Sequence, residues 1–377
     1  MRMHVDRNVR RVVVHPSVVV KAALVLACAS ALAAPSLRAA PIDYPMVTVR
    51  DAGNAADTTG YGAVGYEYGI GKYDVTIGQY TTFLNAVAKT DAYSLYNTNM
   101  GTDLNIAGIS RTGSSGSYVY SVMNNGGSSA NRPITYVSWF DAARFANWMA
   151  NGQPTGAQST TTTENGAYNL NGATSGTAPA KNGTNPNTSA APTFWIPTEN
   201  EWYKAAYYQP TASGGPSDGY WAYATKSDTA PGNVIGPSAN QANYYTGAGY
   251  SVTQSGSYSS SQNYLTDVGA FTGSASFYGT FDQSGNVNQW NDLNGASGSS
   301  RGLRGGYWGG ANAFNLSSSR RSTNDPSNET YLIGFRLAGP VPVPEPSTWG
   351  MAITALACGG WRMVRARRAR GPEPSGL

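Results

Sequence analysis

The long central part of this chain contains no cysteine and no histidine. Across residues 41–346 no disulfide can form, and neither an imidazole nor a thiolate is available. The exceptions lie near the two ends, and they are His4, His15, Cys28 and Cys358. The central part must therefore be held together by its core and its hydrogen bonds. The same absence removes the commonest general base, the softest metal ligands and the best nucleophile.

The first forty residues have the pattern of an export signal. A basic segment precedes the apolar run of residues 22–34, and Ala31 and Ala33 form an A-x-A cleavage site. The other interpretation is an uncleaved anchor, although about 13 apolar residues fall short of the ~20 that span a bilayer. We predict a signal peptide over residues 1–40, and Cys28 would be removed with it.

The C-terminal end carries a second targeting pattern. Residues 343–348 (VPEPST) precede an apolar segment over residues 349–361 and an arginine cluster over residues 362–370. These are a proline-stiffened spacer, a short membrane segment and a positive stop. Their order resembles the PEP-CTERM sorting tail of exported bacterial proteins, which implies an exosortase as partner and release into the envelope or the medium. The alternative is a permanent tail anchor, and we assign residues 341–377 to this tail.

The two ends also carry the excess positive charge. The whole chain has a net charge of +4, whereas residues 41–346 hold 14 Lys and Arg against 19 Asp and Glu, a net charge of −5. Binding to nucleic acid needs clustered cations that neutralise phosphates. We therefore expect no nucleic-acid partner.

The central part is rich in Gly, Ser, Thr, Asn and Tyr, a composition that favours turns, short strands and long ordered loops. Capping residues before aromatic-rich amphipathic runs predict three helices, over residues 76–88, over residues 138–149 and from Thr198 onward. Residues 151–192 hold few large apolar side chains and are predicted to be a surface insertion, with a possible hairpin at residues 164–172.

Several aromatic and glycine motifs follow one another in order. They are YGIGKYDVTIGQY at 68–80, RPITYVSWFDA at 132–142, WIPTENEW at 195–202, GNVNQW at 285–290, RGLRGGYW at 301–308, RR at 320–321 and GFR at 334–336. Together they resemble the sulfatase-modifying-factor (formylglycine-generating enzyme) domain family. The resemblance implies one α+β domain over residues 41–340 with a variant C-type-lectin-like fold of few helices, short strands and much irregular loop.

Most of the motif residues are expected to be structural. Gly305 and Gly306 permit close approach of the backbone, and Arg336 can tie loops together through its five donors. The large apolar anchors are Trp195, Trp202 and Trp290.

The resemblance breaks at the catalytic residues. Active formylglycine-generating enzymes bind copper through two cysteines shortly after the Arg-Gly-Gly motif, and thiolates suit Cu(I). A second enzymatic branch uses histidine-bound iron. The corresponding loop here, residues 307–319, has no cysteine, and the central part has no histidine, so we expect neither copper nor iron. A non-catalytic protein is favoured.

An enzyme with an oxygen-ligated metal or a carboxylate site is the alternative. Its candidate carboxylates are Asp141, Glu199, Glu201, Asp282 and Asp292. The first three also suit a purely structural role, because acids in the first turn of a helix interact favourably with the helix dipole.

One structural metal site is implied by the resemblance. In the family a calcium ion binds beside the Gly-Asn-Val motif, and the matching ligands are the side chains of Asp282 and Gln289 and the carbonyls of Gly285 and Val287. The family often has Glu where this chain has Gln289, so binding should be weaker here.

We therefore predict an exported recognition module for a glycan or a matrix protein. The loop that replaces the catalytic loop supplies the candidate contacts Tyr307, Trp308, Asn312, Phe314 and Asn315. In the competing interpretation Trp308 and Phe314 only fill the core beneath this loop. A matrix structural protein without a discrete ligand is a further alternative.

Overall fold

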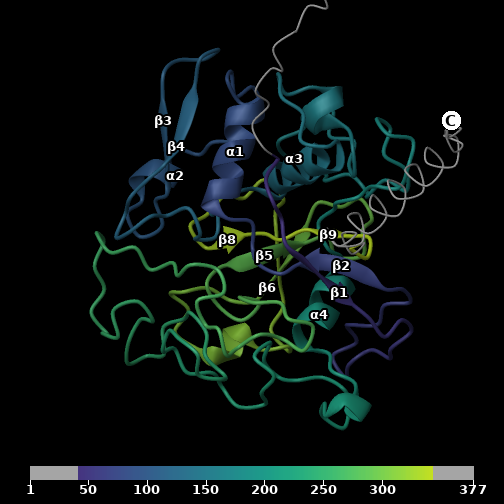
Figure 1. The fold of residues 1–377 in the computed structure, drawn as a ribbon, viewed down its shortest axis with the longest axis vertical. Coiled ribbons are helices and arrows are strands. Elements are labelled where there is room, and N and C mark those ends of the chain that lie inside the picture. Colours follow the sequence, from purple (N-terminus) through teal and green to yellow (C-terminus); the bar gives the residue numbers. More distant parts are fainter. Residues whose placement is uncertain (1–40, 343–377) are drawn as a thin grey trace, which may run out of the picture. The chain divides into compact units, whose positions relative to one another are not determined.

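Short strands and a few helices are joined by long ordered loops in the computed structural model, which describes residues 41–342 (Figure 1). This is the predicted α+β architecture. The predicted signal peptide, residues 1–40, and the predicted tail from residue 343 onward lie outside the described residues. Within residues 41–342, no helix has the length and apolarity needed to cross a membrane.

The strands form three small sheets. Their bounds are β1 (Met46–Val49), β2 (Tyr68–Gly71), β3 (Ile109–Thr112), β4 (Val119–Val122), β5 (Asn288–Asn291), β6 (Arg301–Arg304), β7 (Ser322–Asn324), β8 (Ile333–Gly334) and β9 (Ala338–Gly339). The sheet orders are β1-β2-β9, β3-β4 and β7-β6-β5-β8, and only the β5–β8 pair is parallel. Pairing of β2 with β9 thus joins the two ends of the domain.

Three longer helices begin at the predicted caps. They are α1 (Ile77–Val87), α3 (Trp139–Ala150) and α4 (Glu199–Tyr207), and each has a complete capping box. Shorter helical turns are α2 (Asn99–Thr102), a π turn (Thr160–Glu164) and two 3-10 turns (Thr211–Ser213 and Ala313–Leu316). The side chain of the N-cap accepts a bond from the N3 backbone in each longer helix, which fixes the start of the helix locally.

The main core lies between α1, α3 and the central strands. Phe83 packs against Phe145 with ring centroids 5.2 Å apart, and Phe145 packs against Phe335 at 5.4 Å. In Figure 1, α1 and α3 lie on one side of β5 and α4 lies on the other. Helix α4 is joined to β5 by a bond of 2.7 Å from the Trp202 indole nitrogen to the Gln289 side-chain oxygen. Trp202 is therefore an anchor, as predicted, and a hydrogen-bond donor as well.

The predicted surface insertion over residues 151–192 is not confined to the surface. Every residue of α3 is buried, and this segment supplies part of its cover. Glu164 accepts two bonds from Arg144, of 2.8 and 3.0 Å, while Tyr168 and Leu170 join the main core. No strand forms over residues 164–172, so the hairpin interpretation was wrong. The ion pair to α3, rather than a strand ladder, holds the segment in place.

Arg336 cross-links four segments of the domain. Its guanidinium is fully buried and donates to the Gly71 carbonyl at 2.9 Å, to Asp74 Oδ1 at 2.9 Å, to the Phe281 carbonyl at 2.7 Å and to Gln289 Oε1 at 2.6 Å. The partners lie as far as 265 positions away in sequence. The prediction that Arg336 ties loops together is confirmed.

Replacing Arg336 with methionine should lower the free energy of unfolding by ~3–5 kcal/mol, because it leaves Asp74 buried without its counter-charge. Burial raises the pKa of Asp74 well above its usual range, and the Arg336 guanidinium opposes that rise. Without Arg336, the pKa of Asp74 in the folded state moves further above its unfolded value of 3.8. A raised pKa in the folded state makes the folded protein less stable as pH rises toward that pKa. Urea unfolding should therefore show a larger deficit at about pH 8 than at about pH 5.

The matched control is Arg50→Met, which removes an exposed arginine directly after β1. It should change stability by less than ~0.5 kcal/mol. Equal losses in the two variants would contradict the cross-linking role.

Candidate functional site

The loop after β6 is shaped by two glycines. Gly305 and Gly306 have backbone φ values of 102° and 75°, which residues other than glycine rarely adopt. A Cβ on Gly306 would also lie 2.9 Å from the carbonyl oxygen of Asn315. This turn leads directly into Tyr307 and Trp308, and the Trp308 amide donates to the Asn286 carbonyl at 3.0 Å. The predicted close approach of the backbone is confirmed.

Trp308 forms the floor of a cavity of about 480 Å³. The indole is only 4% exposed and stacks on Tyr264, with centroids 4.8 Å apart and planes 9° apart. The other residues that line the cavity come from distant parts of the chain. The lining of this tyrosine pocket is Asp103, Asn105, Tyr136, Tyr250, Tyr258, Tyr307, Trp308, Gly309 and Tyr331. Pockets of this size and character are typical of small-molecule sites.

Two polar side chains on one wall are held in fixed positions. Asp103 accepts a hydrogen bond of 2.9 Å from the Tyr136 hydroxyl and one of 3.2 Å from the backbone amide of Asn105. The side-chain nitrogen of Asn105 donates to two carbonyls of the loop at residues 259–262, and its oxygen accepts from the Tyr258 hydroxyl. Burial, and then Asp103, raise the pKa of Tyr136, so its hydroxyl remains a donor. The wall presents an oriented carboxylate and amide beside aromatic rings.

The floor contributes one unsatisfied donor. The indole N–H of Trp308 is buried, and no atom of the described residues accepts a hydrogen bond from it. Buried donors in native proteins are generally paired, so an unpaired one in a pocket lining is a feature to explain.

The structure separates the five contacts predicted from the loop. Tyr307 and Trp308 line the tyrosine pocket, whereas Asn315 lines a second groove that Tyr307 also borders. Phe314 is 52% exposed and lines neither. Asn312 lines neither as well, because its side chain caps the 3-10 turn by accepting from the Phe314 amide at 2.9 Å. Trp308 belongs to a buried core cluster and also lines the tyrosine pocket.

Most of the pocket was not found from the sequence. The residues that sequence reasoning missed are Asp103, Asn105, Tyr136, Tyr250, Tyr258 and Tyr331. Tyr136 lies inside the RPITYVSWFDA motif, which was a signal for the family and not for a ligand. The others lie in loops whose tyrosine content was the only available hint.

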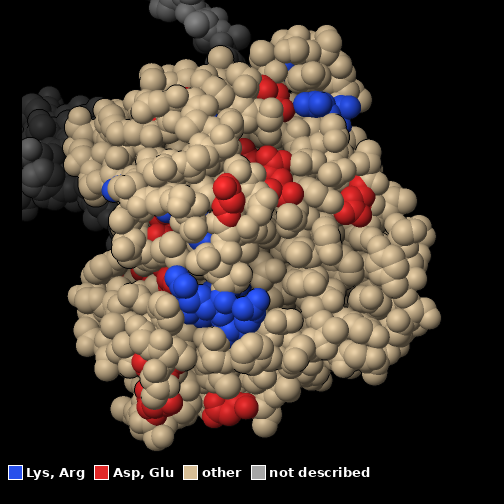
Figure 2. All heavy atoms as spheres, turned by 180° about the vertical axis from the view of Figure 1, so that it is seen from behind, with Lys and Arg blue, Asp and Glu red and all other residues tan. Residues whose placement is uncertain are grey.

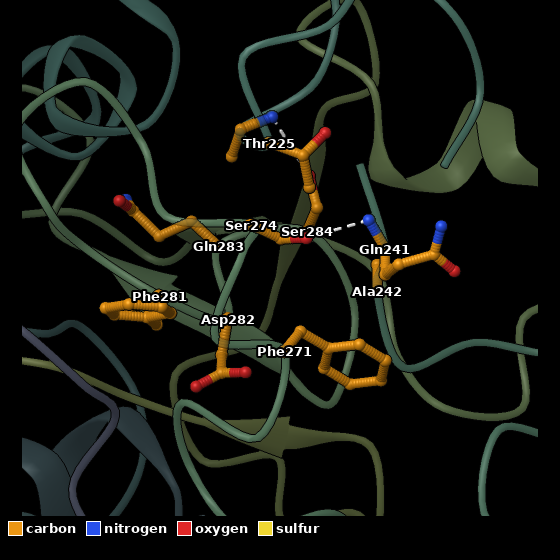
Figure 3. A pocket seen from close by; sticks show the side chains of 10 residues that line it. Thr225, Gln241, Ala242, Phe271, Ser274, Phe281, Asp282, Gln283 and Ser284 are labelled. Carbon is orange, nitrogen blue, oxygen red and sulfur yellow. Dashed lines mark hydrogen bonds between the residues drawn. The ribbon is translucent and has the colours of Figure 1, made fainter. Parts of the chain in front are cut away.

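The predicted calcium ligands do not fit an ion as they are arranged. Gln289 Oε1 already accepts two bonds, from Trp202 at 2.7 Å and from Arg336 at 2.6 Å, and the second donor is a cation. Asp282 Oδ2 accepts from the Gly269 amide at 2.7 Å. Figure 3 shows the small cavity that Asp282 lines; its volume is about 10 Å³, roughly the space of one water, and none of the other predicted ligands belongs to its lining. Carbonyls and carboxylates alone are what calcium prefers, so a neighbouring guanidinium disfavours it.

The carboxylates considered as acid–base candidates have structural partners. Asp141 and Glu201 complete the capping boxes of α3 and α4, and Glu199 pairs with two arginines. Asp292 lies 2.8 Å from Arg301. Burial raises the pKa of Asp292 to about 7, and Arg301 acts against this rise. None of the five candidate carboxylates, Asp282 included, lines the tyrosine pocket.

Three solved structures have partial similarity to this chain. CarF shares 18% sequence identity, with 80% of this chain and 99% of that chain covered and a TM-score of 0.45. Treponema denticola variable protein 1 shares 19%, with 79% and 96% covered and a TM-score of 0.41. PvdO from Pseudomonas aeruginosa shares 15%, with 80% and 92% covered and a TM-score of 0.37. No curated protein matches the chain in sequence.

Family comparison gives the clearest relationship. Residues 58–340 match the family described as "Sulfatase-modifying factor enzyme 1-like domain". This stretch includes every described helix and every described strand except β1, and it contains the tyrosine pocket. The chain therefore belongs to the sulfatase-modifying factor (formylglycine-generating enzyme-like) domain family.

Proposed function

We propose that the domain is a non-catalytic recognition module that binds a saccharide in the tyrosine pocket. The observation that carries this proposal is the combination of aromatic rings and fixed polar groups in one cavity. Trp308 lines the cavity and stacks on Tyr264, which does not line it, and Asp103 and Asn105 of the lining are oriented by hydrogen bonds. Aromatic faces suit the C–H faces of sugar rings, while carboxylate and amide oxygens suit hydroxyl groups.

The size of the pocket also suits a sugar. A cavity of about 480 Å³ has room for a small number of pyranose rings, and the rim tyrosines leave it open to a longer chain. Tyr331 and Tyr258 on this rim are 38% and 57% exposed. Exposed tyrosines provide contact area at a small loss of side-chain entropy, as they do in other recognition surfaces. A saccharide thus fits better than an apolar ligand.

Binding is favoured over cleavage by the content of the lining. Asp103 is the single carboxylate in the part of the lining that the structure describes. Glycoside hydrolysis generally uses two carboxyl groups on opposite sides of the scissile bond. The enzyme alternative would require sugar release by the purified protein, which a reducing-end assay measures directly.

The site of action follows from the two ends of the chain. The signal-like segment at residues 1–40 and the PEP-CTERM-like tail at residues 341–377 support export, sorting by an exosortase-type enzyme and a final location in the envelope or outside the cell. Polysaccharide matrix is then the natural source of the ligand. A matrix protein is the other ligand class and would be indicated if no glycan binds.

Truncating the pocket rim should abolish most of the affinity. We expect Tyr331→Ala and Tyr307→Ala to weaken binding of a glycan-array hit at least about tenfold, because each removes a ring that can stack on the ligand. Titration by tryptophan fluorescence should follow the interaction through Trp308. Thermal unfolding of the same variants checks that the fold is retained.

Phe314→Ala is the matched control, because Phe314 is an exposed aromatic of the same loop that lines neither cavity. It should leave affinity unchanged. The reverse result, with Phe314→Ala defective and Tyr331→Ala normal, would place binding on the loop surface and contradict the pocket. Trp308→Ala is a poorer test, because Trp308 is buried in a core cluster and its loss would also destabilise the fold.

Processing of the ends gives a separate test. In a bacterium that has an exosortase, the exported protein should lack both the signal and the arginine cluster at residues 362–370. Glu345→Ala, which alters the VPEP segment, should retain the tail. Intact-mass measurement of the wild-type and variant proteins checks both points. A wild-type mass that includes the tail would show a permanent anchor instead.

A further inference from the structure

A second groove adjoins the tyrosine pocket and has a different character. It has a volume of about 380 Å³ and lies along the four-stranded sheet β7-β6-β5-β8. Asn288, Arg304, Asn324 and Ile333 come from the four strands, and Arg320 borders the groove just before β7. Its polar lining consists of amides, hydroxyls and guanidinium groups, and it includes no carboxylate among the described residues.

The charged side chains that line the groove are both arginines, Arg304 and Arg320. Glu199 Oε1 lies 2.8 Å from Arg304 Nε and 2.8 Å from Arg321 Nε, so one carboxylate serves two guanidinium groups. Arg320 is a third guanidinium, and it has no ion-pair partner in the described part of the chain. Arg320 is therefore the cation of this region whose charge is not paired directly.

Arg320 is the guanidinium that can contact a ligand. Arg304 is buried, and it donates to Glu199 and to the carbonyls of Ser318 and Arg320. Arg320 is exposed, and one bond of 2.8 Å, to the Arg321 carbonyl, engages only part of its fork. A guanidinium has five N–H donors and matches the geometry of carboxylates. The donors of Arg304 are thus used within the protein, whereas Arg320 has N–H donors left for a ligand.

Two acids adjoin groove residues in sequence without lining the groove. Asp325 follows Asn324, and its carboxylate accepts from the hydroxyl and the backbone amide of Ser327 at 2.6 and 2.8 Å. Glu329 precedes Thr330, and it accepts from the Asn97 side chain at 2.6 Å. These neutral donors orient the carboxylates and do not remove their charge, so a ligand carboxylate must be bound by direct contact with Arg320 and not by a net charge of the region. On the face shown in Figure 2 the charged groups are sparse, and the Lys and Arg side chains there gather mainly in one band.

Tyr307 connects the two cavities. It lines both the tyrosine pocket and the groove, so a chain molecule that stacks in the first can continue across this ring into the second. The two cavities differ in charge, since the first holds Asp103 and the second is bordered by Arg320. A polymer whose neighbouring units differ in charge would satisfy both.

We infer that the groove beside Arg320 is a subsite for the carboxylate of an acidic sugar unit, which makes the ligand a uronate-containing polysaccharide. This inference rests on the proposed saccharide binding and adds the chemical class of the ligand. The tyrosine pocket holds one sugar ring by stacking, and the guanidinium of Arg320 binds the carboxylate of a following unit. Discrimination between acidic and neutral chains is then assigned to the groove, and general sugar affinity to the pocket.

Paired oligosaccharides test the assignment. The probes are two tetramers that alternate a uronate with a neutral sugar, one with galacturonate and one with mannuronate, each with its carboxyl-reduced counterpart, and a sulfated galactan tetramer. Titrated into the exported protein at low salt, each uronate should bind at least about tenfold tighter than its reduced form, as expected for one charge-assisted contact. Arg320→Met should remove this preference and leave binding of the reduced forms unchanged. Added salt should weaken only the acidic probes.

Arg50→Met is the matched control, because it deletes an exposed arginine that borders neither cavity. Equal binding of acidic and reduced probes would overturn the inference and leave the proposed function intact. An undiminished preference in Arg320→Met would also overturn it. Tighter binding of the sulfated probe than of the uronates would replace carboxylate by sulfate as the ligand group. Absence of binding by every probe and by a neutral glycan array would overturn the proposed function together with the inference.

Discussion

The buried guanidinium of Arg336 is the interaction on which the rest of the domain depends. The central part has no disulfide, and its strands are no longer than four residues, so strand ladders alone give little cohesion. Arg336 brings together the end of β2, the residues after it, the loop at Phe281 and strand β5. A hydrophobic replacement could pack there, but it would leave several acceptors and one carboxylate unpaired. This polar cross-link holds distant segments of the chain together, which is the role of disulfides in many small exported proteins.

The same construction recurs at the edges of the domain and explains how loops can form a precise site. Glu164 on Arg144 holds the segment that covers α3, and Glu199 on Arg304 holds the start of α4 against β6. Loops fixed at their bases by such pairs can carry rigid side chains at their tips. Tyr307 is an example, since it comes shortly after β6, whose Arg304 pairs with Glu199. The buried pair at Arg304 thus supports the strand that leads into this wall of the pocket.

Prediction from the sequence succeeded where the cause is local. The helix starts were predicted because a cap and its reciprocal partner lie three positions apart, and the role of Arg336 was predicted because a buried guanidinium needs several acceptors. The pocket was largely missed because Asp103, Tyr250 and Tyr331 meet only through tertiary packing. Burial of residues around Tyr168 was missed because small polar neighbours resemble a surface loop. The partners of Gln289, Trp202 and Arg336, were not predicted, because the family pattern gives positions and not hydrogen-bond partners.

The chemistry left to the pocket follows from what burial does to tyrosine. Without imidazole or thiol in residues 41–346, the hydroxyl groups of Tyr136, Tyr250 and Tyr307 are its most abundant polar atoms. Burial raises the pKa of each of them, so they stay protonated at neutral pH and serve as neutral donors and acceptors. A neutral phenol is a weak nucleophile and a weak base, but it donates and accepts hydrogen bonds. It also stacks, and hydrogen bonding and stacking are the interactions by which a sugar ring is held. Under the proposed function, the tyrosines of the pocket act on the ligand through these two interactions.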